Sequence, residues 1–189
     1  MKTEKDKLAQ LNQIKDDAIL LHDANVIDQS LEKLAKSITH DYADKQPVFL
    51  VVMNGGLVFA GNLLPKLNFP AQLDYCHATR YRGEISGGEI EWKTTSNIDL
   101  NGRHVVIIDD ILDEGYTLQA VIQDCINKNV ASVKTCILIE KLHDRKAVKN
   151  MRPDYCELTT PDQYVFGFGM DCNHYWRNCD SIYILNSDI

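Results

Sequence analysis

The sequence lacks an excess of positive charge. Its 189 residues carry 20 Lys and Arg against 27 Asp and Glu, which gives a formal net charge of −7. General nucleic-acid binding needs a basic face to meet the phosphate backbone, so this balance argues against it. We therefore expect no nucleic acid among the partners of this protein.

Long hydrophobic runs are missing as well. The longest apolar stretches have the length of a strand, as in Val48–Met53, whereas a membrane-spanning helix needs about 20 apolar residues. The N-terminus reads MKTEKDKLAQ, without the apolar centre of a signal peptide. We expect a cytoplasmic protein with no membrane partner.

Cysteine pairs with metal-binding spacing are also absent. The six cysteines are scattered, and none forms a CxxC pair. Cys172 and Cys179 flank His174, but their separation of seven matches no structural zinc pattern. We expect reduced and mostly buried thiols, as in an ordinary cytosolic protein.

The sequence does show an alternation of apolar patterns. Residues 4–21 and 27–43 have helical periodicity, and Asn25 or Asp28 is placed to cap the second helix. Further helices are expected at Leu57–Leu67 and Thr117–Asn127, and strands at Val48–Met53, Leu73–His77, His104–Asp109, Val133–Glu140, Tyr164–Phe168 and Ser181–Leu185. This order predicts an α/β domain with a mainly parallel sheet, which binds ligands at the carboxyl ends of its strands.

The segment from Arg80 to Trp92 has a different character. It reads RYRGEISGGEIEW and carries Gly83, Gly87 and Gly88 among polar residues. This composition predicts either a mobile hairpin that acts as a lid or a plain surface hairpin. The residues alone favour neither.

The most informative stretch is Val105–Thr117, which reads VVIIDDILDEGYT. It predicts a buried strand, a tight acidic loop and a helix N-terminus, where Gly115 and Thr117 suit a phosphate group. Successive backbone N–H groups from Asp113 onward can wrap the phosphate as an anion nest. Four carboxylates within six residues repel one another unless a cation or sugar hydroxyls occupy the site.

This stretch resembles the phosphoribosyl-pyrophosphate (PRPP) loop of type I phosphoribosyltransferases. It has two acids, two apolar residues, Asp, any residue, Gly, any residue and Thr in the family order, with mild departures at Asp109, Glu114 and Tyr116. The resemblance implies that Asp109 and Asp110 position the ribose hydroxyls and that Asp113 is the general base. The PRPP-binding set that it implies here is Asp109, Asp110, Asp113, Glu114, Gly115, Tyr116 and Thr117.

Over roughly residues 45–185 the chain is similar to the hypoxanthine-guanine phosphoribosyltransferases. Asn54, Gly55 and Gly56 lie where that family has its pyrophosphate loop, with Asn54 in place of the usual Lys. The likeness implies a cis peptide bond between Met53 and Asn54. Arg80 and Tyr81 stand where the family has Ser-Tyr on its closing lid, and we hypothesise that Arg80 offsets the missing Lys.

The likeness also implies a purine-binding set. Lys141 would donate to the 6-oxo group, which favours hypoxanthine or guanine over adenine because an ammonium only donates. Tyr164 would stack on the base, the backbone of Val165 would contact its edge, and Ile111 belongs to the same set. Asp171 matches an acid associated with a second magnesium, and Arg177 matches an arginine that contacts pyrophosphate.

The resemblance implies the type I phosphoribosyltransferase fold, with helices flanking the central sheet. We expect one domain over residues 1–189, with a core at about 45–150, a small hood built from the two terminal segments and a lid at about 80–92. The implied reaction transfers phosphoribose from PRPP to N9 of hypoxanthine or guanine. Mg²⁺ is the implied cofactor, held by Asp109, Asp110 and Asp171.

Two alternatives stay open. Another base is possible as substrate, although Lys141 speaks against adenine and the Tyr164–Asp171 segment against pyrimidines, which leaves xanthine. A PRPP-sensing regulator that binds nucleic acid is disfavoured by the acidic balance. The family likeness implies a homodimer or a homotetramer.

Overall fold

The computed structural model describes residues 3–80 and 90–186. Its central sheet has the strand order β4-β3-β2-β5-β6-β7. These strands are β2 (Val48–Val52), β3 (Gln72–Arg80), β4 (Ile90–Thr94), β5 (His104–Leu112), β6 (Ser132–Lys141) and β7 (Leu158–Thr160). Every neighbouring pair is parallel except β3 and β4. The prediction of a mainly parallel sheet is therefore confirmed.

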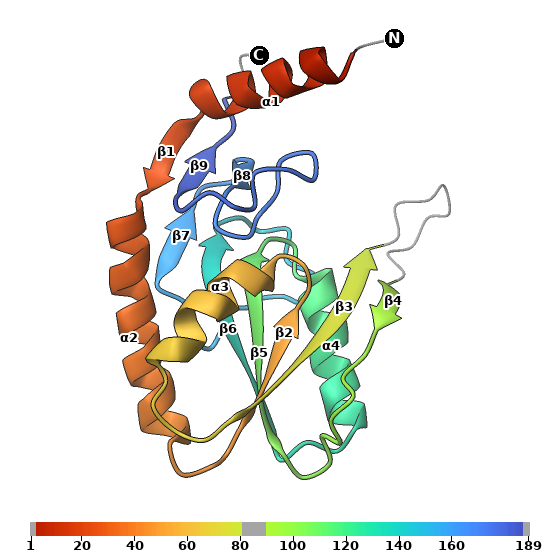
Figure 1. Cartoon of the computed structure of the whole chain (residues 1–189). Coiled ribbons are helices and arrows are strands. Elements are labelled where there is room, and N and C mark those ends of the chain that lie inside the picture. The colour runs from red at the N-terminus through yellow and green to blue at the C-terminus, as the bar shows by residue number, and fades with distance from the viewer. Residues whose placement is uncertain (1–2, 81–89, 187–189) are drawn as a thin grey trace.

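Helices cover both faces of this sheet (Figure 1). Helix α2 (Ala24–Tyr42) and helix α3 (Gly56–Leu63), which continues into a short 3₁₀ turn at Leu64–Lys66, lie on one face with Phe49 and Val51. Helix α4 (Tyr116–Asn127) lies on the other with Val48 and Leu50. Since both faces are buried, the central strands read as continuous apolar runs.

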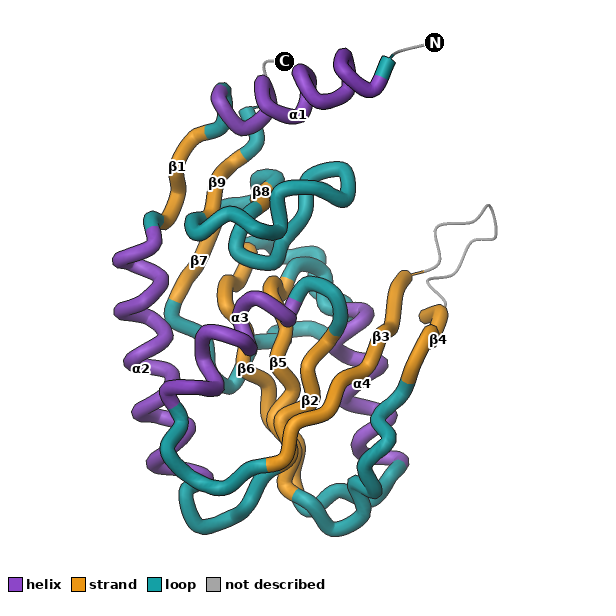
Figure 2. The backbone as a smooth tube through the Cα atoms, viewed as in Figure 1, coloured by secondary structure: helices purple, strands orange, loops and turns teal. Residues whose placement is uncertain are grey.

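The two terminal segments form the expected hood. Strands β1 (Ile19–His22), β9 (Ile182–Ile184) and β8 (Val165–Phe166) pair antiparallel in that order. Figure 2 shows the loops of the C-terminal segment over the upper ends of the central strands. Helix α1 (Glu4–Asp16) joins this hood, because the Trp176 indole N–H donates to the Leu11 carbonyl at 2.9 Å.

Two expectations for the N-terminal region are wrong. The helix expected over residues 4–21 ends at Asp16, and residues 19–22 become β1, because the backbone there pairs with β9. The cap of α2 is Asp23, which accepts from the Val26 N–H at 2.8 Å, rather than Asn25 or Asp28. Tertiary strand pairing overrides helical periodicity at β1.

Two further differences between the expected and the observed structure concern strands of the central sheet. Strand β5 continues past Asp109 to Leu112 because its backbone stays paired with β6 as far as Glu140. The sequence does not predict strands β4 and β7, which the structure adds to the sheet.

Of the expected lid, residues 90–92 begin β4, whereas residues 81–89 lie outside the described part of the chain. Within the described ranges, no helix combines the length and apolarity needed to cross a membrane.

Candidate active site

The loop between β5 and α4 consists only of Asp113, Glu114 and Gly115. Gly115 has a φ of +86°, which other residues rarely adopt, and a Cβ there would lie 2.7 Å from the Met151 sulfur, so glycine is favoured at this position. Gly115 is also the N-cap of α4, and since glycine has no side chain it offers no capping hydrogen bond to the first turn. The first-turn N–H groups, which include that of Thr117, therefore suit an anion.

Asp109, which is buried, and Asp110, which is partly buried, form an acidic pair near the end of β5. The Asp110 N–H donates to the Asp109 carboxylate at 2.9 Å, and the Ile111 N–H donates to the Asp110 carboxylate at 2.8 Å. Burial raises the pKa of both carboxyls, and the charge of Asp110 raises the pKa of Asp109 further. The positive charge of Arg177 acts in the opposite direction. The pair therefore favours a cation or hydroxyl donors beside it.

Gly55 and Gly56 bring the β2–α3 loop into close contact with this pair. A Cβ at Gly55 would overlap the Asp110 carboxylate, and one at Gly56 would lie 2.8 Å from the Ile108 carbonyl oxygen. The hood loop joins them, because a Cβ at Gly169 would overlap the Gly55 carbonyl oxygen. The expected cis peptide bond between Met53 and Asn54 is confirmed.

Asp113 shares its two carboxylate oxygens between two donors. Lys141 donates from Nζ to Oδ2 at 2.7 Å, and His143 lies with Nε2 at 2.7 Å from Oδ1. Burial opposes ionisation, but the hydrogen bonds from Lys141 and His143 lower the pKa of Asp113 overall. The expected general base and the expected base-selecting lysine are therefore in direct contact.

Lys146 ties the ends of β5 and β6 together. Its ammonium donates to three carbonyl oxygens, those of Leu112 at 3.0 Å, Asp113 at 2.8 Å and Lys141 at 2.7 Å. Burial lowers the pKa of Lys146. These bonds hold the backbone of the acidic loop beside the strand that ends at Lys141.

The expected purine segment lies in the hood. The Tyr164 hydroxyl donates to the Asp171 carbonyl at 3.0 Å, and half of the Tyr164 surface is exposed, whereas Val165 is buried in β8. Arg177 donates to the Gly169 carbonyl at 2.6 Å and to the Asp171 carboxylate at 2.5 Å. The backbone here is unusual, since positive φ angles occur at Gly167, Phe168, Gly169, Asn173, His174 and Trp176. Such conformations gather at functional sites.

The expected metal ligands do not form one preformed cluster. Among residues 3–80 and 90–186, no three His, Cys, Asp or Glu side chains are arranged to hold a metal ion. Asp171 instead pairs with Arg177. The adjacent carboxylates of Asp109 and Asp110 still fit Mg²⁺, because this ion is commonly bound through one or two carboxylates together with substrate phosphates.

Sequence reasoning missed His143 and Lys146. Both belong to the run Lys141–Lys146, KLHDRK, which follows a buried strand and is rich in donors. This concentration of donors after a strand is the sequence feature that could have indicated them. Their carbonyl and carboxylate partners, however, are set by the fold. Of the expected lid residues, Tyr81 and the side chain of Arg80 lie outside the described residues.

Comparison with known proteins gives a consistent result. The model of the phosphoribosyl transferase domain family matches residues 20–174. A Tritrichomonas foetus protein named hypoxanthine-guanine-xanthine phosphoribosyltransferase is 31% identical over 170 residues, covering 90% of this chain and 92% of that protein. A Streptococcus pneumoniae hypoxanthine-guanine phosphoribosyltransferase is 31% identical over 164 residues, covering 86% and 90%. A Staphylococcus aureus hypoxanthine phosphoribosyltransferase structure has a TM-score of 0.82 at 25% identity, covering 88% and 90%.

The two glycines at positions 55 and 61 provide a matched test of the crowding around Asp110. Gly55→Ala is expected to lower the free energy of unfolding by about 1–3 kcal/mol, because the new methyl group overlaps the Asp110 carboxylate. Gly61→Ala, in the interior of α3 with nothing within 4 Å of the new Cβ, is expected to raise it by about 0.5–1 kcal/mol. Urea unfolding of both variants measures the difference. Equal stabilities would contradict the crowding.

Proposed function

The chain belongs to the phosphoribosyl transferase domain family, and we propose that it transfers the 5-phosphoribosyl group from PRPP to N9 of hypoxanthine or guanine. The products are the nucleoside 5′-monophosphate and pyrophosphate. The observation that carries the choice of base is the contact between Lys141 and Asp113, with 2.7 Å between Nζ and Oδ2. The names of the relatives from T. foetus and S. pneumoniae agree with a purine substrate.

The Lys141–Asp113 pair offers a donor and an acceptor side by side. A 6-oxopurine presents O6 and N7 next to each other on one edge. The Lys141 ammonium has three donors, one of which is used by Asp113, so others remain for O6. Asp113 then accepts the N7 proton as N9 attacks the anomeric carbon. Adenine would set its 6-amino donors against those of Lys141, which leaves both unpaired.

PRPP would lie across the other half of the site. We place its 5′-phosphate on the N–H groups from Asp113 to Thr117, since Gly115 leaves the first turn of α4 without a side-chain cap. The ribose hydroxyls would lie at Asp109 and Asp110. The pyrophosphate would lie between the Asn54–Gly56 loop and Arg177, which the contact of Gly169 with Gly55 brings close together.

Mg²⁺ fits the same half of the site. Asp109 and Asp110, with Asp171 for a second ion, would hold it together with the oxygens of PRPP. When bound, the ion supplies positive charge for the departing pyrophosphate. Arg177 supplies the corresponding charge from the protein, once it releases the Asp171 carboxylate.

A steady-state assay of pyrophosphate release with hypoxanthine, guanine, xanthine and adenine tests this function. We expect turnover with hypoxanthine and guanine, dependence on added Mg²⁺, and no measurable turnover with adenine. Xanthine is the second candidate, because the T. foetus relative is named for it as well. Absence of turnover with every purine would overturn the proposed function.

Asp113→Asn tests the proton acceptor. The amide keeps the shape of the side chain but accepts no proton, so kcat with hypoxanthine is expected to fall by about 100-fold or more. The far-UV circular dichroism spectrum and the binding of PRPP should stay close to those of the unchanged protein. Near-normal turnover would remove Asp113 from this role.

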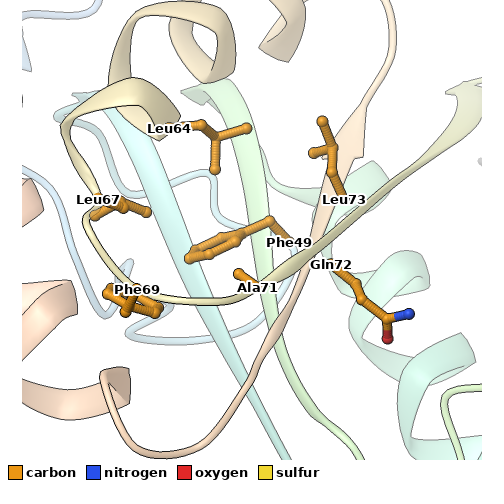
Figure 3. A pocket seen from close by; sticks show the side chains of 7 residues that line it. All are labelled: Phe49, Leu64, Leu67, Phe69, Ala71, Gln72 and Leu73. Atoms are coloured by element: carbon orange, nitrogen blue, oxygen red, sulfur yellow. The ribbon is translucent and has the colours of Figure 1, made fainter.

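We also propose that two copies of the chain associate through the exposed side chains of β3, the strand next to the edge strand β4. Leu73 and Tyr75 on β3 are 61% and 43% exposed, although their partners on β2, Phe49 and Val51, are buried. Figure 3 shows an apolar pocket beside them, lined by Phe49, Leu64, Leu67, Phe69, Ala71, Gln72 and Leu73. Exposed apolar surface of this kind marks association sites, and the family likeness implies a homodimer or a homotetramer, both of which need an interface between two copies.

Leu73→Glu is expected to convert the dimer into a monomer, because it places a charge in the apolar contact. Leu8→Glu is the matched control, since Leu8 is similarly exposed at 59% but lies on α1. Light scattering coupled to gel filtration gives the mass of each variant. A monomeric unchanged protein, or a dimer that survives Leu73→Glu, would contradict this interface.

A further inference from the structure

His143 is an enclosed side chain with both ring nitrogens engaged. Its side chain is 4% exposed, and it lies two residues after the end of β6. Nε2 is 2.7 Å from the Asp113 carboxylate, and Nδ1 accepts the Arg145 backbone N–H at 3.0 Å. Nothing in the function described above gives this histidine a part.

The two contacts fix where the imidazole carries its proton. A ring nitrogen that accepts a backbone N–H has no proton of its own, so Nδ1 is unprotonated. The proton is therefore on Nε2, and it is donated to Oδ1 of Asp113. In this form Nε2 already carries its proton, and Nδ1 can take one up only by breaking the hydrogen bond from Arg145, so His143 does not serve as a relay.

We propose that His143 is a positioning residue for the phosphoribosyl transfer, and that it holds the Asp113 carboxylate in the orientation that receives the N7 proton of the purine. This inference rests on the proposed function. Its basis is that Oδ1 is held by His143 and Oδ2 by Lys141, so the carboxylate cannot rotate without losing both bonds. Lys141 divides its donors between Asp113 and the 6-oxo group of the base, whereas the Nε2 proton of His143 is donated to Asp113 alone.

The groups that surround this carboxylate come from two segments. The end of β6 and the loop that follows contribute Lys141, His143, Arg145 and Lys146. The β5–α4 loop contributes Glu114, the residue after Asp113. Arg145 makes a bidentate pair with Asp162, at 2.5 and 3.0 Å, and its backbone N–H holds His143. The orientation of Asp113 therefore depends on contacts that run through His143 and Arg145 to Asp162, two residues before Tyr164.

Two substitutions separate the hydrogen bond from the bulk of the ring. His143→Phe fills the space but removes the donor, and we expect kcat with hypoxanthine to fall by about 10- to 100-fold, the usual worth of a hydrogen bond to a charged group. The KM for PRPP should change less than about threefold, because the phosphate loop is untouched. His143→Gln keeps an N–H donor and should restore kcat to within about threefold of the unchanged protein.

The control is His40→Gln, which removes an exposed histidine bonded to its neighbour Asp41. Its kinetics should match those of the unchanged protein. Thermal unfolding of all variants shows whether any loss reflects a damaged fold. Equal losses in His143→Phe and His143→Gln, with a raised KM for PRPP, would overturn the proposal in favour of a merely structural role. Full activity in His143→Phe would overturn it as well.

The pH profile adds a readout that a structural role would not change. The His143 hydrogen bond lowers the pKa of Asp113, so its loss raises that pKa. The acid limb of kcat/KM for the base should then move to higher pH in His143→Phe and stay in place in His143→Gln. An unmoved limb in both variants would contradict the orientation of Asp113 by His143.

Nitrogen-15 NMR of the imidazole tests the geometry without any activity. The hydrogen bonds of His143 predict signals of a protonated Nε2 and an unprotonated Nδ1, and the reverse tautomer would overturn the proposal. If the unchanged protein shows this tautomer but turns over no purine, the proposed function fails. If it turns over hypoxanthine and His143→Phe does so equally well, the inference fails alone.

Discussion

Three segments from distant parts of the chain meet at Gly55 with no room for a methyl group. The Asp110 carboxylate lies on one side of it, and Gly169 of the hood packs against its carbonyl oxygen. This close packing sets the distance between the central sheet and the hood. The acidic pair, the Asn54–Gly56 loop and Arg177 are consequently arranged around one small space. Backbone forms the closest part of this contact, and apolar side chains of the hood pack beside it into the core of the central sheet.

The acidic residues of this site differ in how readily they ionise, because their surroundings differ. Burial raises the pKa of Asp109 and Asp110, whereas Lys141 and His143 lower that of Asp113. The first two carboxyls are thus suited to meeting a cation or hydroxyls. The two donors on Asp113 lower its pKa and so favour its ionised form. The carboxyl groups of one short acidic run therefore differ in pKa because they have different neighbours.

The sequence predicts local features of this protein better than long-range ones. The β5–α4 loop could be predicted because its strand, acids, glycine and helix are contiguous, and the fold class followed from the alternation of apolar patterns. The contacts of His143 and Lys146 could not, because their partners come from another strand end. Residues 19–22 carry the periodicity of a helix, yet pairing with β9, more than 150 residues away, makes them a strand. Such pairing leaves no signal in a local window.

The three carbonyl bonds of Lys146 have a consequence for transferring this site to other proteins. They join the acidic loop and the segment that begins at Lys141 into one rigid unit, which neither β5 nor β6 forms alone. A chimera that exchanges only the segment after β6 would leave the carbonyl oxygens of Leu112 and Asp113 without this cation. The end of β5 and the segment after β6 would therefore have to be exchanged together, as one module of two strand ends.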